Sequence, residues 1–254
     1  MIRSYNSSLS KSKTPVSVLL TLLFVYVVLF EFILPFNNVL PKPSLVLESL
    51  VSLWNDYNLF DAFASSTSVV YVSLLLGYLI VNFLSGYLIK IYFELSGIYN
   101  GLKIFRYFPA FFYAVLFAFW FPTSFIAEFV FVLIAAIFFY GLSLIDQCSK
   151  ADEAYIDSAK SFGLSNQKIY SKVVWKNCQP EVFKSTYKIH YYLWILILLF
   201  EFIGGVEGFG SLYKSVLEFA DFAGLFALAV VIAILIWLGN LAIKVIENKI
   251  IYWK

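Results

Sequence analysis

Six apolar stretches of membrane-spanning length recur along this chain of 254 residues, and they restrict its fold more than any other feature. A hydrocarbon core of ~30 Å needs about 20 helical residues at 1.5 Å each. Polar segments interrupt the chain between the stretches. We therefore expect an all-α membrane protein with about six transmembrane helices, at Val16–Phe36, Ser65–Phe93, Ile104–Phe121, Phe125–Ile145, Thr186–Ile203 and Ala223–Ile243.

The composition excludes an ordinary soluble domain. The chain is 61% hydrophobic and 13% charged, whereas soluble domains are roughly 45–50% apolar and about 25% charged. The two cysteines, Cys148 and Cys178, lie far apart in a polar part of the chain. Because they lack the close paired spacing of a zinc or redox site, we expect reduced thiols.

The basic residues predict the orientation. If the N-terminus is cytoplasmic, the inner segments hold all but two of the 18 lysines and arginines, and the exceptions are Lys42 and Lys214. Cytoplasmic loops of membrane proteins are enriched in these residues. An even number of spans places both termini on one side, so both are expected in the cytoplasm.

The predicted domain organisation is a cytoplasmic segment 1–15, a transmembrane domain 16–243 and a cytoplasmic tail 244–254. The first residues are polar and basic, and a spanning apolar run follows them. Neither the short apolar core nor the small-residue cleavage site of a secretory signal peptide is visible, so no cleaved signal is expected.

The outer segment after the first span carries a helical pattern. Pro41 and Pro43 stop the span, and Ser44 can cap a new helix. Apolar residues then recur at helical spacing from Leu45 to Trp54. We expect an amphipathic helix that lies at the outer surface and seals the rim of the bundle, with a solute contact as the alternative.

The inner segment 146–188, between the fourth and fifth spans, is hydrophilic and far longer than a turn requires. Asp152 can cap a first helix in this segment. Tyr155, Ala159 and Phe162 fall on one face of that helix. The segment is therefore predicted to have a structure and a role of its own.

A glycine divides this inner segment. Gly163 follows the last apolar residue of the first helix, where a left-handed C-terminal stop is usual. Ser165 can cap a second helix that runs to about Cys178, and Pro180 is expected to end it. A helix–Gly–helix of this kind is suited to docking into a groove on a soluble partner.

Residues 157–163 of this segment, followed by Val173 and Pro180, resemble the cytoplasmic EAA loop of binding-protein-dependent ABC importer permeases. By position, Asp157 stands for the glutamate of that loop, Ser158 and Ala159 for its two alanines, Gly163 for its glycine and Val173 for its isoleucine. Trp175-Lys176 departs from the family pattern, which has Leu-Pro there.

The resemblance implies that the segment is a coupling helix that sits in a cleft of a separate ATP-hydrolysing subunit. The implied ATPase-coupling residues are Asp157, Ser158, Ala159, Phe162, Gly163, Val173 and Pro180. It further implies a second permease copy, forming a homodimer, and an extracytoplasmic solute-binding protein as partners. The implied location is the inner membrane of a bacterial cell, where the chain also contacts lipid.

Four further landmarks are similar to the nitrate, sulfonate and taurine branch of that family. They occur in the expected order: residues 40–44 (LPKPS), residues 106–109 (RYFP) with Trp120-Phe121, residues 201–204 (EFIG) and residues 208–210 (GFG). The resemblance covers almost the whole chain and implies import of a small solute of this kind. The identity of the solute stays open.

Three glutamates, Glu31, Glu128 and Glu201, fall near the outer ends of apolar runs. An ionised carboxylate costs roughly 2.5–3.5 kcal/mol at the centre of a transmembrane helix. Two interpretations are open: a polar gate at the mouth of the path, or acids that are solvated or hydrogen-bonded near the interface.

Other candidate site residues lie in the fifth span and beyond it. Gly204, Gly208 and Gly210 follow Glu201 and are assigned with it to a possible pore or outer gate, since glycines allow a tight outer loop. His190 is the single histidine of the chain, so it is expected to pack at the membrane interface and not to bind a metal.

The chain has no phosphate-binding loop and no motif of a metal-dependent or serine hydrolase, so no enzymatic activity, cofactor, metal or nucleic acid is expected. Two alternatives to the importer remain. An ion-coupled secondary transporter would show internal repeats and charges at mid-membrane. A membrane-embedded enzyme acting on lipids would need clustered acids or histidines at the membrane surface.

Overall fold

A computed structural model describes residues 14–34, 40–94, 101, 109–149 and 153–251. Within these ranges every regular element is a helix, which confirms the all-α class. The elements are α1 (Thr14–Val27), η1 (Val28–Ile33), α2 (Pro43–Asn55), α3 (Leu59–Glu94), α5 (Ala110–Trp120), α6 (Phe125–Cys148), α7 (Glu153–Ser161), α8 (Asn166–Lys168), η3 (Ile169–Val174), α9 (Trp175–Lys184), α10 (Thr186–Gly204), α11 (Phe209–Glu218) and α12 (Phe222–Ile250).

Four of the described helices, α3, α6, α10 and α12, are long and apolar enough to cross a membrane. They match the second, fourth, fifth and sixth predicted spans. The first and third predicted spans contain shorter apolar helices, at Leu20–Ile33 and Phe111–Trp120. Residues 102–108, at the start of the third predicted span, lie outside the described part of the chain.

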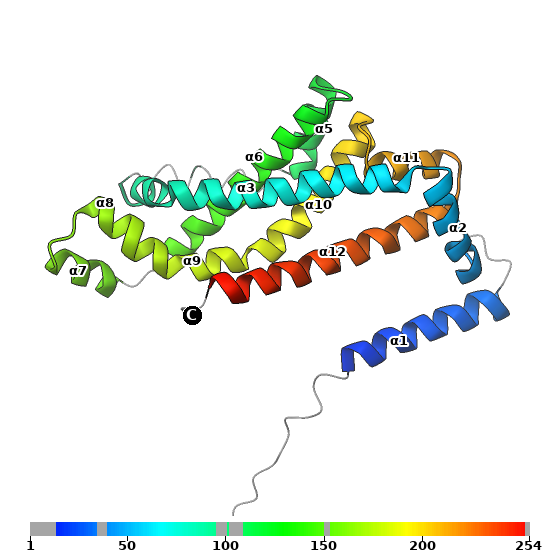
Figure 1. Cartoon of the computed structure of the whole chain (residues 1–254), viewed down its shortest axis with the longest axis horizontal. Helices are drawn as coiled ribbons and strands as arrows, with labels where there is room; N and C mark the ends of the chain where they lie inside the picture. The colour runs from blue at the N-terminus through cyan, green and yellow to red at the C-terminus, as the bar shows by residue number, and fades with distance from the viewer. Residues whose placement is uncertain (1–13, 35–39, 95–100, 102–108, 150–152, 252–254) are drawn as a thin grey trace, which may run out of the picture.

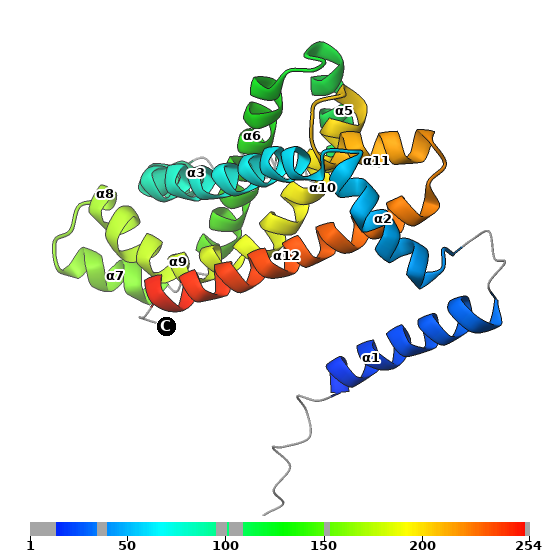
Figure 2. The same cartoon turned by 45° about the vertical axis from the view of Figure 1, so that its right-hand side comes forward.

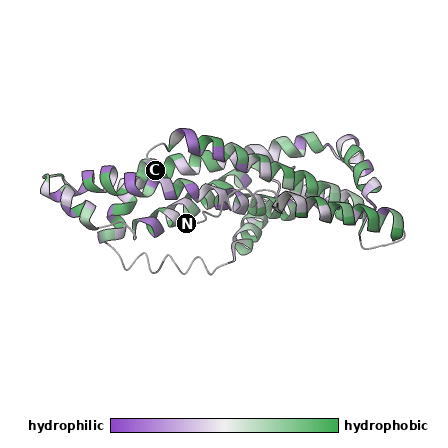
Figure 3. Ribbon diagram, turned by 90° about the horizontal axis from the view of Figure 1, so that it is seen from below, coloured by the Kyte–Doolittle hydropathy of each residue, from purple (hydrophilic) through white to green (hydrophobic). Residues whose placement is uncertain are grey.

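The long helices run between two ends of the molecule, and each end carries different short helices (Figure 1). One end carries α7, α8 and the end of α12, and the other carries α2 and α11, as the turned view in Figure 2 also shows. Hydrophobic residues line the middle of the bundle, and hydrophilic ones are more frequent at the end that holds α7 and α8 (Figure 3).

Close packing of α3, α6 and α10 forms the centre of the bundle. A Cβ atom on Gly77 of α3 would lie 2.8 Å from that of Ala136 on α6, so these two helices approach closely. Phe131 of α6 stacks on Phe200 of α10, with ring centroids 5.6 Å apart. Helix α1 lies apart from this core, and its apolar side chains stay exposed, as at Phe24 with 67% exposure.

The predicted outer amphipathic helix is present as α2, which packs against α12. The prediction that Ser44 caps this helix is wrong. The helix begins at Pro43 after Lys42, and the Ser44 backbone N–H and hydroxyl donate to the Glu31 carboxylate at 3.2 and 2.9 Å. A carboxylate suits the positive end of a helix dipole. Glu31 is therefore a hydrogen-bonded acid that ties the first span to α2.

His190 is a packing residue of the protein interior, because its side chain is fully buried. Trp194 Nε1–H donates to His190 Nε2 at 3.0 Å, so this ring nitrogen is the acceptor. The proton of the neutral ring therefore lies on Nδ1, which donates to Asn240 Oδ1 at 3.1 Å. Sequence spacing could not reveal this partner on α12.

Candidate functional site

The inner segment folds as the helix–Gly–helix expected from the sequence. Helix α7 ends in a turn in which Gly163 has a φ of +72°. Its N–H bonds to the Lys160 carbonyl at 2.8 Å, and the Leu164 N–H bonds to the Ala159 carbonyl at 3.3 Å. This pair of bonds is the Schellman motif, which ends helices at a left-handed glycine. The predicted role of Gly163 as a stop is confirmed, and the predicted cap Asp152 lies outside the described residues.

The tip of the segment exposes apolar side chains. Phe162 is 86% exposed and Tyr155 is 58% exposed, whereas Ala159 is only 5% exposed. The three residues, which their spacing places on one face, therefore differ in burial. Ala159 faces the protein, where α7 contacts η3. Phe162 projects from the turn and is free to enter a complementary pocket.

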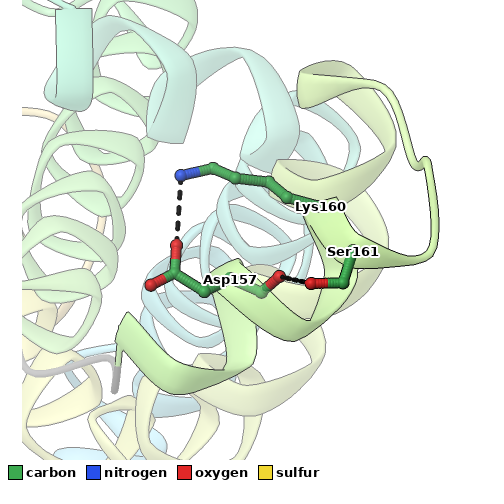
Figure 4. Close-up of polar contacts among 3 residues, drawn as sticks. All are labelled: Asp157, Lys160 and Ser161. Atoms are coloured by element: carbon green, nitrogen blue, oxygen red, sulfur yellow. Dashed lines mark hydrogen bonds and ion pairs between the residues drawn. The ribbon is translucent and has the colours of Figure 1, made fainter.

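Three polar residues of α7, Asp157, Lys160 and Ser161, contact one another (Figure 4). Lys160 Nζ lies 3.3 Å from Asp157 Oδ1, and the Ser161 hydroxyl donates to the Asp157 carbonyl at 3.0 Å. Both side chains of the ion pair are more than half exposed. Such pairs contribute about 0–1 kcal/mol to stability, so Asp157 is available to contact a partner. Ser158 beside it is exposed as well.

The second helix is longer than expected. It begins after Ser165, whose side chain makes no capping bond, and passes through the π-helical turn η3 into α9. Pro180 lies inside α9, which continues to Lys184, so the prediction that Pro180 ends the helix is wrong. A proline removes one N–H donor to the carbonyl four residues earlier, and packing of the surrounding helix outweighs that loss here. Val173 packs against the buried core.

The opposite end of the molecule contains the second predicted set of residues, at the corner between α10 and α11. Glu201 is fully buried. Its Oε1 accepts from the Ser66 hydroxyl at 2.5 Å, and its Oε2 accepts from the Gly210 N–H at 2.6 Å. Ser66 in turn accepts from the Phe209 N–H at 2.9 Å. Glu201 and Ser66 therefore satisfy the first N–H groups of α11.

The glycines around Glu201 permit this close approach. A Cβ atom on Gly208 would collide with the Glu201 carboxyl group, and one on Gly210 with the Leu198 carbonyl oxygen. Gly204 ends α10 and packs near Ala118 of α5. The left-handed residue of the turn is Gly205, with a φ of +67°.

Two polar residues near Glu201 complete the corner. Glu128 of α6 is fully buried, so it is not a solvated acid, and it lies close enough to Glu201 for their carboxyl groups to interact. Ser66 of α3 was missed at the level of sequence. The one available signal is that it belongs to the polar run of residues 65–68 inside an apolar span.

The two cysteines meet although they are distant in sequence. Both are free and buried, as reduced thiols in a packed core. Their Sγ atoms lie 3.6 Å apart and join the inner end of α6 to α9. The second helix of the inner segment is therefore packed firmly against the bundle.

This arrangement defines a class of protein: a multi-pass helical membrane protein with a structured helix–Gly–helix segment at one end. The family model "Binding-protein-dependent transport system inner membrane component" matches residues 96–252. Since this match covers more than half of the chain, the protein belongs to that family, the permeases of ABC importers.

A solved structure supports the fold. The chain is similar to a chain of the structure titled "Inward facing conformations of the MetNI methionine ABC transporter", with a TM-score of 0.63 and 16% sequence identity. The similarity covers 75% of this chain and 95% of the other. At this identity the match concerns the fold alone. No curated protein matches the sequence of this chain.

Proposed function

We propose that the chain is the transmembrane subunit that forms the path for a small solute and receives ATP-driven motion through residues 153–184. The observation that carries this proposal is the exposed Phe162 at a tip whose shape is fixed by the left-handed Gly163. A rigid apolar tip buries area on a partner without first losing conformational freedom. Asp157, Ser158 and Ala159 lie in the helix beside the tip, and Val173 and Pro180 lie in the helix that carries it.

The proposed partners are a separate ATP-hydrolysing subunit, a second copy of the chain and an extracytoplasmic solute-binding protein. The tip then faces the cytoplasm, together with both termini, and this orientation is supported by the lysine-rich inner segment. The end of α12 lies at the same end of the molecule as α7, which agrees with a cytoplasmic tail 244–254 (Figure 1).

We further propose that the corner of α10 and α11 forms part of the outer gate. Glu201 is fully buried, so it acts by holding α11 in place and not by touching solute. Gly204, Gly208 and Gly210 allow the tight corner. Two features support the branch that imports nitrate, sulfonate, taurine or a similar solute: residues 40–44, which lead into α2, and the Glu-x-x-Gly run that builds this corner.

Purification of the chain from its native membrane in mild detergent tests the proposal. We expect a soluble subunit with a phosphate-binding loop to co-purify and to be identified by mass spectrometry. Substitution Phe162→Asp should remove that subunit, because burial of a charge in an apolar pocket is costly. The matched control is Phe219→Asp, at a phenylalanine of the opposite end that is 75% exposed. Uptake into liposomes by the chain alone, with no such subunit, would contradict the proposal.

A further inference from the structure

The inner half of α3 and the second helix of the inner segment meet along a regular line of contacts. Positions on each helix are four residues apart and so share one face. The helices run antiparallel, and the facing pairs are Tyr78 with Gln179, Asn82 with Trp175, and Gly86 with Ser171. We call these six residues the seam.

Hydrogen bonds fix the register of the seam. Asn82 Oδ1 accepts from Trp175 Nε1–H at 3.0 Å and from Gln179 Nε2–H at 3.4 Å. Gln179 Nε2–H also donates to the Tyr78 hydroxyl at 3.1 Å. A Cβ atom on Gly86 would lie 2.7 Å from the Ser171 Cβ, so the two backbones touch at the third pair.

The donors of the seam are buried and depend on these acceptors. Trp175 is 4% exposed and Gln179 is 7% exposed. A slip of one helix along the other would leave the indole N–H without an acceptor, which is costly in a buried site. Trp175 also occupies the position where the family pattern has leucine, and leucine has no N–H to donate.

Helix α3 connects the seam to the outer corner. It is a single helix of 36 residues with no proline. Asn82 of the seam and Ser66 of the corner are 16 positions apart on it, about 24 Å at 1.5 Å per residue. Ser66 bonds both Glu201 and the N-terminus of α11. A displacement of α3 at its inner end thus has a direct hydrogen-bonded route to α11.

We propose that the seam transmits motion of the docking tip to α3, and that α3 moves the outer corner of α10 and α11. Trp175 and Asn82 are positioning residues in this route: they hold the two helices in register. The inference rests on the proposed function, because the motion must come from an ATPase bound at the tip.

The test uses the complex purified with its co-purifying ATPase and a single environment-sensitive fluorophore on α11. The fluorophore is attached to Leu217→Cys, an exposed position, in a background with Cys148→Ser and Cys178→Ser. The emission change caused by MgATP with orthovanadate reports movement of the corner. Seam variants are Trp175→Phe and Asn82→Leu. The control is Tyr140→Phe, which removes a buried hydrogen bond of 3.0 Å to Thr186, outside the seam.

We expect the seam variants to retain the ATPase and its hydrolysis of ATP but to lose the emission change, while Tyr140→Phe keeps it. The double variant should lose no more than Asn82→Leu alone, because the bond that Trp175→Phe removes is one of the two that Asn82→Leu removes. If the seam variants keep the full emission change, the inference is wrong and the proposed function still stands. The same conclusion follows if Tyr140→Phe loses the emission change as fully as the seam variants do. A chain that purifies without any ATPase overturns the proposed function and this inference together.

Discussion

Replacing Gly163 with valine is expected to remove the ATPase from the purified complex while leaving membrane insertion intact. Gly163 has a φ of +72° and its neighbourhood is open, so the substitution acts through the backbone and not through a clash. A β-branched residue in a left-handed conformation costs about 1–3 kcal/mol. Since every 1.4 kcal/mol is a tenfold change in an equilibrium, the population of the native tip should fall roughly 5- to 140-fold.

The matched control for this change is Gly163→Asn, because asparagine tolerates the left-handed region and often ends helices. The measurement is the ratio of ATPase to permease in the purified sample, with membrane insertion followed by the amount of permease in the membrane fraction. Equal ATPase recovery for valine and asparagine would show that the geometry of this turn is unimportant for docking.

Replacing Glu201 with leucine is expected to give the largest loss of stability among the changes considered. It leaves the Gly210 N–H without its acceptor and removes the partner of the Ser66 hydroxyl, both in a buried site. An unsatisfied buried group costs about 1–3 kcal/mol. Glu201→Gln should cost less, because its amide oxygen can still accept one of these bonds.

Thermal unfolding in detergent, followed by intrinsic fluorescence, measures this effect. Glu218→Gln on the exposed end of α11 is the control, and a change at such a surface position is usually within ±0.5 kcal/mol. A melting temperature of Glu201→Leu equal to that of the control would contradict the assigned role of the carboxylate in holding α11.

The features that depend on periodicity and local geometry could be predicted from the sequence. The length of the apolar stretches indicated the spans, because the thickness of a bilayer sets the length of a helix that crosses it. Gly163 could be assigned because a left-handed stop favours glycine and leaves a local pattern. The region around Glu201 could be singled out because an acid in an apolar run is rare. The sequence did not indicate that Ser66 is its hydrogen-bond partner.

The features that depend on tertiary packing could not be predicted. Pro180 sits inside a helix because packing overrides the local preference of proline. Nothing in the spacing of Cys148 and Cys178 indicates that their sulfur atoms meet. The Trp175–Asn82 bond joins residues 93 positions apart, and Trp175 had seemed only a departure from a family pattern.

The most direct test of the central claim is photo-crosslinking from the tip. A photoreactive amino acid in place of Phe162, the 86% exposed residue of the turn, would be activated in native membranes, and the same group in place of Phe219 would serve as the control. The account predicts that position 162 crosslinks to a soluble protein with a phosphate-binding loop and that position 219 does not. The account would be contradicted if position 162 crosslinked only to lipid or to the chain itself.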